Sequence, residues 1–253
     1  MNLEDRKAIV VGGASGMALA TVELLHDKGV SVAILDLPTS RGAEIAFEKG
    51  IVFRECNILD YALTEVALRE TAEELGGLNI VVTTAGGGIG KRTLGRDGPH
   101  SMEDFTRVID LSLNASFNIS RIAADIMKDE EPDEGGERGV IINTASIAAF
   151  EGQIGQVAYT AAKAGVAGMA LTMARDLGNL GIRVMAIAPS LFATGATEAI
   201  PPEMAEVLTK DAAFPKRMGQ PREYALLAKS IIENPMLNGS TIRLDAGIRF
   251  SPR

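Results

Sequence analysis

The chain has few of the residues that form disulfides or bind metals. Its 253 residues include one cysteine, two histidines and no tryptophan. The single cysteine, Cys56, excludes an intrachain disulfide and fits a reducing compartment. His26 and His100 lie far apart in the sequence, so with one cysteine they form no metal-ligand pattern. We therefore predict that the protein has no metal site.

Long hydrophobic runs and basic runs are also missing. No apolar stretch approaches the length of a membrane span, and the opening "MNLEDRKAIVVGG" lacks the apolar core of a signal peptide. The net charge is −8, and no basic run is longer than "KR". A surface for nucleic acid is therefore not expected. We expect a cytoplasmic protein that contacts no membrane.

What the sequence does contain is 46% apolar residues, in short β-branched runs that alternate with helical patterns. The runs that predict strands are 7–13, 30–36, 51–56, 78–87, 139–146, 182–190 and 240–247. The helical patterns cover 16–29, 40–50, 61–77, 102–128, about 157–177 and 221–233. Continuous apolar strands separated by helices are typical of a parallel sheet covered on both faces. We predict an α/β protein: one Rossmann domain over residues 1–253, with a seven-stranded, mostly parallel, doubly wound sheet.

Three segments interrupt this alternation. Residues 86–101 form a Gly-rich loop, and the acidic residues 128–139 are expected to be an exposed insertion. Residues 191–217 contain Gly and Pro and no strand pattern, which suggests a lid over a substrate, with a short helix over 203–210. The apolar residues of that helix face either a substrate or the core; they are Met204, Val207 and Leu208.

The loop after the first strand, "GGASGMA" at residues 12–18, predicts a nucleotide site. Gly12 and Gly16 bracket a turn that lets the backbone approach a pyrophosphate at the N-terminus of the next helix. Asp36 ends the second strand, where a carboxylate accepts hydrogen bonds from ribose hydroxyls and repels a 2′-phosphate. The alternative is a tight turn followed by a helix-capping Asp. The combined pattern favours a dinucleotide site, and Asp36 favours NAD over NADP.

The stretch "AYTAAKAG" places Tyr159 and Lys163 on one helix face, one turn apart. Hydride transfer needs an acid or base beside the reacting oxygen, and a nearby ammonium lowers the pKa of a phenol. Ser146 ends the strand 13 residues before Tyr159, at the sheet edge where ligands bind. Taken singly, the pair fits an ordinary amphipathic helix, and Ser146 fits a helix or turn cap. Together they predict a catalytic cluster.

These motifs resemble those of the short-chain dehydrogenase/reductase family over nearly the whole chain. The matching segments are "VGGASGMA", "TTAG" at 83–86, "LSLNASF", "YTAAK" and "PSLFAT" at 189–194. The resemblance implies that Asn114 holds a water linking Lys163 to solvent, and that Thr194 bonds the nicotinamide carboxamide. Thr83 stands where the family has Asn, which leaves an inter-strand contact unassigned. The implied NAD-binding residues are Gly12, Ser15, Gly16, Met17, Asp36, Asn57, Ile58, Thr84, Ala85, Gly86, Tyr159, Lys163, Pro189, Phe192 and Thr194.

A narrower resemblance joins the chain to the type-2 3-hydroxyacyl-CoA dehydrogenases, through "AFEGQ", the acidic insertion and the C-terminal region. It implies that Gln153 and Gln156 line the substrate pocket with Ser146 and Tyr159; the alternative for the two glutamines is surface polarity. We predict a homotetramer that oxidises the hydroxyl of a small molecule, a 3-hydroxyacyl-CoA, with NAD. The alternatives are a hydroxysteroid dehydrogenase, a 3-oxoacyl carrier-protein reductase, or an NAD-binding sensor or scaffold.

Overall fold

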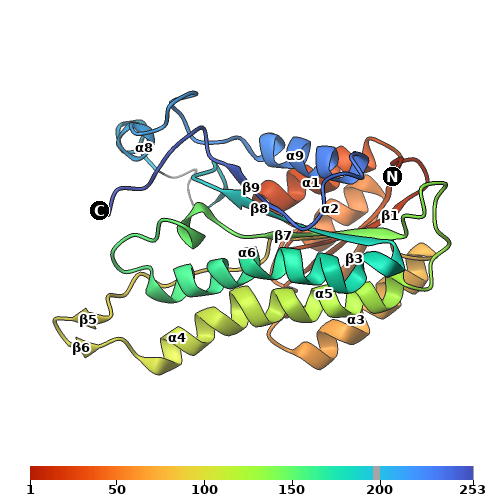
Figure 1. Cartoon of the computed structure of the whole chain (residues 1–253), viewed down its shortest axis with the longest axis horizontal. Helices are drawn as coiled ribbons and strands as arrows, with labels where there is room; N and C mark the ends of the chain where they lie inside the picture. The colour runs from red at the N-terminus through yellow and green to blue at the C-terminus, as the bar shows by residue number, and fades with distance from the viewer. Residues whose placement is uncertain (196–199, 253) are drawn as a thin grey trace.

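The computed structural model describes residues 1–195 and 200–252. Its main sheet is parallel throughout and has the strand order β3-β2-β1-β4-β7-β8-β9 (Figure 1). The strands are β1 (Lys7–Val11), β2 (Ser31–Asp36), β3 (Val52–Glu55), β4 (Ile80–Thr83), β7 (Gly139–Thr144), β8 (Ile182–Pro189) and β9 (Thr241–Leu244). The prediction of a seven-stranded parallel sheet is confirmed.

The helices also follow the predicted periodicity. They are α1 (Gly16–His26), α2 (Gly42–Lys49), α3 (Tyr61–Leu75), α4 (Met102–Ile109), α5 (Ala115–Met127), α6 (Val157–Leu177), α8 (Pro202–Thr209) and α9 (Pro221–Glu233). The predicted helix over 102–128 is divided by a π-helical segment, η1 (Asp110–Asn114). Such a segment rotates the faces of the helix that follows it, and this matters for the site below.

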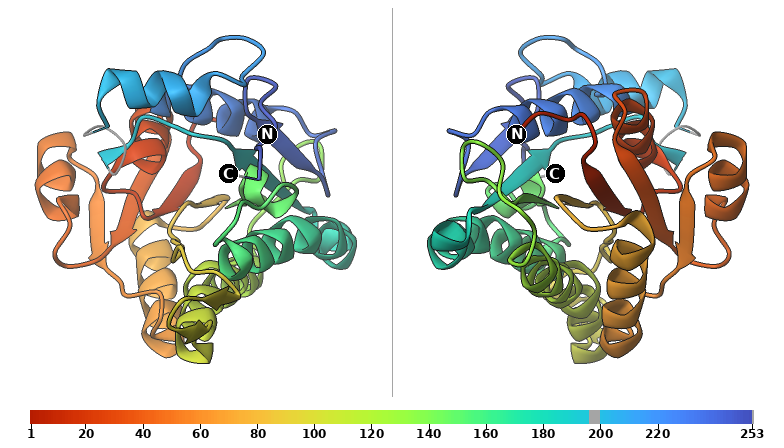
Figure 2. Two further views of the ribbon diagram at one scale, coloured as in Figure 1. Left: turned by 90° about the vertical axis from the view of Figure 1, so that its left-hand side faces the viewer. Right: turned by 90° about the vertical axis from the view of Figure 1, so that its right-hand side faces the viewer.

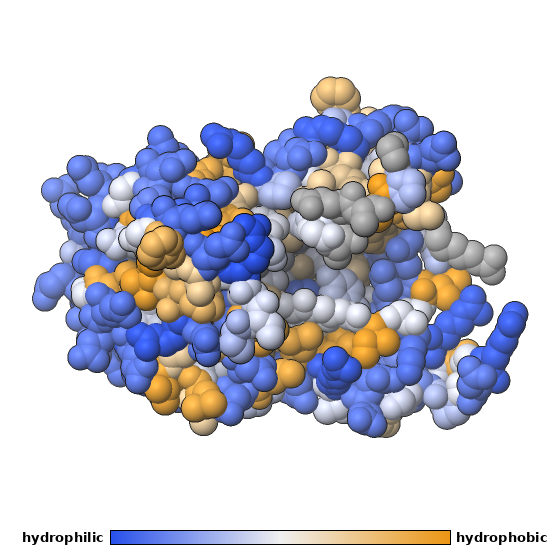
Figure 3. All heavy atoms as spheres, turned by 180° about the vertical axis from the view of Figure 1, so that it is seen from behind, coloured by the Kyte–Doolittle hydropathy of each residue, from blue (hydrophilic) through white to orange (hydrophobic). Residues whose placement is uncertain are grey.

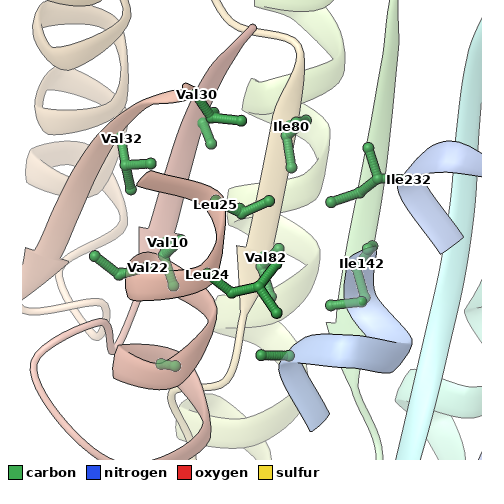
Figure 4. Close-up of a cluster of buried hydrophobic side chains, with 14 of the residues drawn as sticks. Val10, Val22, Leu24, Leu25, Val30, Val32, Ile80, Val82, Ile142 and Ile232 are labelled. Carbon is green, nitrogen blue, oxygen red and sulfur yellow. The ribbon is translucent and has the colours of Figure 1, made fainter. Parts of the chain in front are cut away.

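The sheet has a hydrophobic core on each face. In β1, Val10 points to one face while Ile9 and Val11 point to the other, as the strand alternation requires. The first face is covered by α1, α2 and α9, and Figure 4 shows side chains of α1 and Ile232 of α9 over the strands. The second face is covered by α3, α5 and α6. Each fully buried Val, Leu or Ile contributes roughly 1.5–3 kcal/mol, so both layers hold the strands in register.

The strand order reverses beside β1, which pairs with β2 on one side and β4 on the other. Val11 lies opposite Leu35 in β2 and Thr83 in β4, so the loops after these three strands meet at one edge of the sheet. Figure 2, left, views the molecule from the side of this edge. Parallel sheets bind ligands in the crevice at such a switch point.

Two of the loop predictions need amendment. The Gly-rich loop after β4 contains a projecting hairpin of two short strands, β5 (Leu94–Gly95) and β6 (Gly98–Pro99) (Figure 1). The acidic insertion is mostly exposed, but Glu137 is only 7% exposed. Its carboxylate pairs with the Arg183 guanidinium of β8, with an N–O distance of 2.7 Å. Sequence spacing does not show this pairing because the partner lies 46 residues away.

Within the described residues, no helix combines the length and the apolar character that crossing a membrane requires. Hydrophilic side chains cover most of the face in Figure 3, and the hydrophobic ones form separate patches. The same part of the chain contains no group of three or more His, Cys, Asp or Glu residues able to hold a metal ion.

Candidate active site

The loop between β1 and α1 closes tightly against two other segments. Gly12 and Gly16 have φ angles of +80° and +54°, which residues other than glycine rarely adopt. A Cβ on Gly12 would lie 3.0 Å from the Ala85 nitrogen, and one on Gly16 would lie 3.0 Å from Thr194 Cγ2. The loop therefore needs glycine at both positions, and it brings Ala85 and Thr194 beside the N-terminus of α1.

A cavity of about 500 Å³ opens at this point. Its size lies within the range of small-molecule and cofactor sites. Eleven of the residues predicted to bind NAD line it: Gly12, Ser15, Gly16, Met17, Asp36, Asn57, Ile58, Thr84, Ala85, Gly86 and Thr194. The α1 N-terminus offers backbone N–H groups to an anion there. The residues present therefore fit a dinucleotide.

Asp36, the residue predicted to bind the adenosine ribose, lines this cavity. Its Oδ2 accepts a hydrogen bond of 2.9 Å from the Ala14 nitrogen, and its Oδ1 accepts one of 2.8 Å from the Leu37 nitrogen. These bonds orient the carboxylate at the cavity wall. The cation that follows, Arg41, forms two hydrogen bonds to Glu44. The charge presented to an adenosine ribose is thus negative.

Four residues predicted to bind the cofactor do not line this cavity: Tyr159 and Lys163, which are described below, and Phe192 and Pro189. Phe192 is 6% exposed and packs in the core on the α1 and α9 side of the sheet. Its ring lies against Gly219, where a Cβ would come within 2.6 Å of the ring. The Phe192 side chain thus packs in the core, where Gly219 leaves space for the ring, and a contact of Phe192 with the cofactor stays a prediction. Pro189 is buried at the end of β8.

The structure brings Ser146, Tyr159 and Lys163 together. Ser146 follows β7 by two residues, is 8% exposed, and forms a side-chain hydrogen bond with Tyr159. Lys163 lies one turn along α6, with its Nζ 5.8 Å from the centre of the Tyr159 ring. The cluster stands at the same sheet edge as the cavity, since a Cβ on Gly86 would lie 3.3 Å from Lys163 Nζ.

Burial dominates the protonation of both groups. It raises the pKa of Tyr159, and the hydrogen bond with Ser146 offsets part of this rise. Burial lowers the pKa of Lys163 to about 8. The expected lowering of the Tyr159 pKa by Lys163 was therefore wrong for the protein alone. The physical reason is that the site is dry enough to disfavour both charged forms.

The relay role predicted for Asn114 is not supported by its position. Asn114 is exposed, and its Nδ2 donates a hydrogen bond of 2.7 Å to Asp110. Ser112 takes the inward position instead: it is fully buried, and its hydroxyl exchanges hydrogen bonds with the backbone of Gly87. A Cβ on Gly86 would lie 3.2 Å from Ser112 Oγ, beside Lys163.

Ser112 and Asn114 both lie in the π-helical segment η1, but Ser112 is buried and Asn114 is exposed. The relay role of Asn114 stays a prediction. The sequence motif does not say which of the two residues faces inward. The buried repeat of Ser112, Ser116 and Ser120, at intervals of four, is the signal that identified the inner face.

The two predicted substrate glutamines hold the loop before α6. Gln156 Oε1 accepts a hydrogen bond of 3.0 Å from the Gln153 nitrogen, and Gln153 Nε2 donates one of 3.2 Å to the Ser251 carbonyl oxygen. Gln153 lines a second, more open cavity together with Arg92 and Ile154. Both amides lie in the segment that joins Ser146 to Tyr159, and both already have protein partners.

The predicted lid is partly described. Residues 196–199 lie outside the described residues, and α8 covers the short helix predicted for 203–210. Met204, Val207 and Leu208 are 54%, 61% and 38% exposed, so they form an apolar face and do not pack into the core. Arg217, at the end of the segment, forms two hydrogen bonds to Glu223.

A cavity for a dinucleotide beside a buried Ser–Tyr–Lys cluster, at the switch point of a parallel sheet, defines an oxidoreductase that uses a nicotinamide nucleotide. Residues 6–205 match the family described as short chain dehydrogenase, and the chain belongs to this family.

Individual proteins give a more specific comparison than the family does. The 3-hydroxyacyl-CoA dehydrogenase type-2 of Homo sapiens is 46% identical over 249 residues, which are 97% of this chain and 95% of that protein. A 3alpha-hydroxysteroid dehydrogenase of Mediterraneibacter gnavus is 32% identical over 233 residues, which are 89% of this chain and 88% of that protein. The crystal structure of 3-hydroxyacyl-CoA dehydrogenase type-2 from Mycobacterium avium has a TM-score of 0.94 at 41% identity and covers 100% of both chains. The protein is a dehydrogenase that acts on CH–OH groups of a small molecule.

Proposed function

We propose that the protein interconverts 3-hydroxyacyl-CoA and 3-ketoacyl-CoA thioesters, with NAD as the cofactor. The observation that carries the proposal is the buried cluster of Ser146, Tyr159 and Lys163 in a chain similar over nearly its full length to enzymes named for this reaction. NAD is proposed over NADP because Asp36 is anchored at the cavity wall and Arg41 is engaged by Glu44.

The chain's own residues supply the proton chemistry. The nicotinamide nucleotide, when bound, accepts the hydride from the carbon that carries the hydroxyl. Tyr159 as phenolate removes the hydroxyl proton, and its phenol returns a proton in the reverse direction. Ser146 donates a hydrogen bond to the substrate oxygen. Lys163 as ammonium stabilises the phenolate of Tyr159.

The raised pKa of Tyr159 sets the direction of the pH dependence. Oxidation uses the phenolate, whose fraction grows as pH rises, whereas reduction uses the phenol. Oxidation is therefore expected to accelerate from neutral to alkaline pH, and reduction to be favoured at lower pH.

The acyl chain is proposed to lie against the exposed apolar face of α8, formed by Met204, Val207 and Leu208. Lys210 and Lys216, both exposed near the end of the segment, are the proposed partners of the CoA phosphates. Arg217, at the end of the same segment, is held by Glu223 and is not proposed as a partner of the phosphates. Because these lysines are exposed, salt should screen their attraction and raise the KM for the CoA ester.

A second candidate function is the oxidation of a hydroxysteroid. It is favoured by the similarity to the 3alpha-hydroxysteroid dehydrogenase of Mediterraneibacter gnavus. The same catalytic cluster serves either alcohol, so the substrate surface decides between them.

One assay tests these alternatives. Reduction of acetoacetyl-CoA with NADH is followed at 340 nm, alongside oxidation of a 3α-hydroxysteroid, with NADP(H) in parallel. We expect turnover with the CoA ester and a strong preference for NAD(H). Ready oxidation of the steroid without any reduction of acetoacetyl-CoA would replace the first candidate by the second. Equal kcat/KM for NAD and NADP would refute the role given to Asp36.

A further inference from the structure

A pair of hydrogen-bonded hydroxyl groups lies behind the catalytic cluster. Thr144 is the last residue of β7, and its Oγ1 is 2.7 Å from the hydroxyl oxygen of Tyr224 in α9. The same Oγ1 is 2.7 Å from the Thr83 carbonyl oxygen of β4. Tyr224 is fully buried and Thr144 is 6% exposed. The pair therefore joins α9 to two central strands in an environment without water.

The directions of these bonds follow from the atoms involved. A carbonyl oxygen only accepts, so Thr144 uses its single hydroxyl proton for Thr83. Tyr224 must then donate its own proton to Thr144 Oγ1. Burial raises the pKa of Tyr224, so its phenol keeps this proton throughout the range in which the enzyme works. Thr144 is thus held by two buried hydrogen bonds of defined direction.

The backbone of Thr144 reaches the catalytic cluster. Its carbonyl oxygen accepts a hydrogen bond of 2.7 Å from Lys163 Nζ. Lys163 is 3% exposed, so its ammonium depends on acceptors within the protein. The centre of the Tyr159 ring lies 5.8 Å from this ammonium, and a Cβ on Gly86 would come within 3.3 Å of both the ammonium and the Ser112 hydroxyl of η1. The carbonyl of Thr144 is therefore a main determinant of where the ammonium sits.

We propose that Tyr224 is a positioning residue: through Thr144 it fixes the carbonyl group that holds the Lys163 ammonium beside Tyr159. This proposal rests on the Ser–Tyr–Lys chemistry proposed above. It accounts for a phenol within the apolar cluster between α1, α9 and the sheet, where phenylalanine would fill the same volume. It also assigns to Thr144 the link between β4 and β7 that Thr83 does not make, since the buried Thr83 hydroxyl has no hydrogen-bond partner among the described residues.

The test compares Tyr224→Phe with the wild-type enzyme in NAD-dependent oxidation across pH. We expect kcat to fall about three- to ten-fold, the range of one buried neutral hydrogen bond, with little change in the KM of the alcohol. The pH profile of oxidation should shift as well, because a less firmly held Lys163 ammonium loses its proton at lower pH. Thr144→Val should show the same two effects, and Thr144→Ser, which keeps the hydroxyl, should restore the wild-type profile.

The double variant Tyr224→Phe/Thr144→Val shows whether the two groups act as one unit. Its loss of kcat should be no larger than that of the more affected single variant. Two controls remove hydroxyls elsewhere. Tyr61→Phe removes an exposed hydroxyl that lies 3.4 Å from Asp110, and Thr71→Val removes a fully buried one in α3. Both controls should leave the pH profile unchanged.

A purely structural role for Tyr224 would lower the melting temperature and leave kcat and the pH profile unchanged, and this result would overturn the proposal. Additive losses in the double variant would overturn it as well. A second readout does not need turnover: the ¹³Cε resonance of labelled Lys163, assigned by its loss in Lys163→Met, should titrate at lower pH in Tyr224→Phe. An unchanged titration contradicts the positioning role. Absence of turnover in the wild-type enzyme contradicts the proposed function alone.

Discussion

At the scale of single residues, Tyr159 is the group on which the proposed chemistry depends most directly. It shares one face of α6 with Lys163 and forms a hydrogen bond with Ser146. Its neighbours have different proposed roles: Ser146 donates a hydrogen bond to the substrate oxygen, and Lys163 stabilises the negative charge of the Tyr159 phenolate. The predictions for these residues therefore differ in what each substitution leaves intact.

Tyr159→Phe should reduce turnover by about 10²- to 10⁴-fold, the usual contribution of a general acid or base. Binding of NADH should persist, because the phenol acts on the reacting oxygen and the cavity lining does not depend on it. Stopped-flow turnover and NADH fluorescence titration measure the two effects. If the variant keeps more than about a hundredth of the wild-type rate, Tyr159 is not the acid or base.

The lowered pKa of Lys163 predicts how the free energy of unfolding changes with pH. Its pKa is about 8 in the folded protein and higher when the chain is unfolded, so the unfolded state binds more protons between these values. The cost of the buried ammonium is therefore fully present below pH 8 and is relieved as pH rises above it. Relative to Lys163→Met, the wild-type protein should gain about 2 kcal/mol between pH 7.5 and 9.5.

Urea unfolding of the two proteins at the two pH values measures this gain. The upper limit of pH 9.5 avoids the ionisation of tyrosines in the unfolded chain, which would act in the opposite sense for Tyr159. The same difference between the two proteins at both pH values would show that Lys163 has an ordinary pKa.

At the scale of elements, Glu137 of the acidic insertion forms two buried ion pairs, one with the Arg183 guanidinium of β8 and one with the N-terminal ammonium of Met1, 3.0 Å away. Glu137 accepts from the Arg183 guanidinium, which also donates to carbonyl oxygens of Ile231, Ile232 and Leu237 after and within α9. The Glu137–Arg183 pair thus joins the insertion, β8 and the C-terminal end of α9. The sequence predicts that the acidic insertion is exposed, but in the structure Glu137 connects it to the rest of the protein.

Glu137→Ala should lower the free energy of unfolding by about 3–5 kcal/mol, because it leaves the Arg183 guanidinium and the Met1 ammonium buried without their counter-ion. Glu131→Ala removes an exposed carboxylate from the same insertion and should change stability by no more than about 0.5 kcal/mol. Urea denaturation at one protein concentration compares them. Equal, small effects of both substitutions would mean that the Glu137–Arg183 pair contributes nothing.

At the scale of the whole molecule, α6 presents a stripe for assembly. The stripe consists of the exposed residues Val157, Ala161, Ala164, Gly168 and Leu171, spaced alternately by four and three. Nothing lies within 4 Å of the position a Cβ would take on Gly168, so a partner helix has room to approach. Phe117 of α5 adds an apolar side chain that is 48% exposed.

We expect a tetramer with two-fold symmetry, paired through the helices over 102–128 and 157–177. Light scattering at micromolar concentration should give four times the chain mass of 26.7 kDa. Gly168→Arg should lower this mass by blocking close approach of the helices, whereas Asp176→Ala, an exposed position outside the stripe, should not. A monomeric wild-type mass would refute the assembly, and a tetrameric Gly168→Arg would refute the proposed face.

The sequence by itself determined the features that depend on neighbours along the chain. Strand alternation predicted which residues of β1 face each layer, and the spacing of four placed Tyr159 and Lys163 on one helix face. Gly12, Gly16 and Asp36 identified the nucleotide loop because their backbone requirements are local.

Only the tertiary structure decided the features in which a polar or aromatic group meets a partner remote in sequence. In the π-helical turn Ser112 is buried and Asn114 is exposed, and the Phe192 ring packs in the core against Gly219. Glu137 forms an ion pair with Arg183, and Tyr224 forms a hydrogen bond with Thr144, which lies 80 residues away in the sequence. Such pairings depend on how the helices pack on the sheet and on which polar groups become buried. The local sequence of a segment does not contain that information.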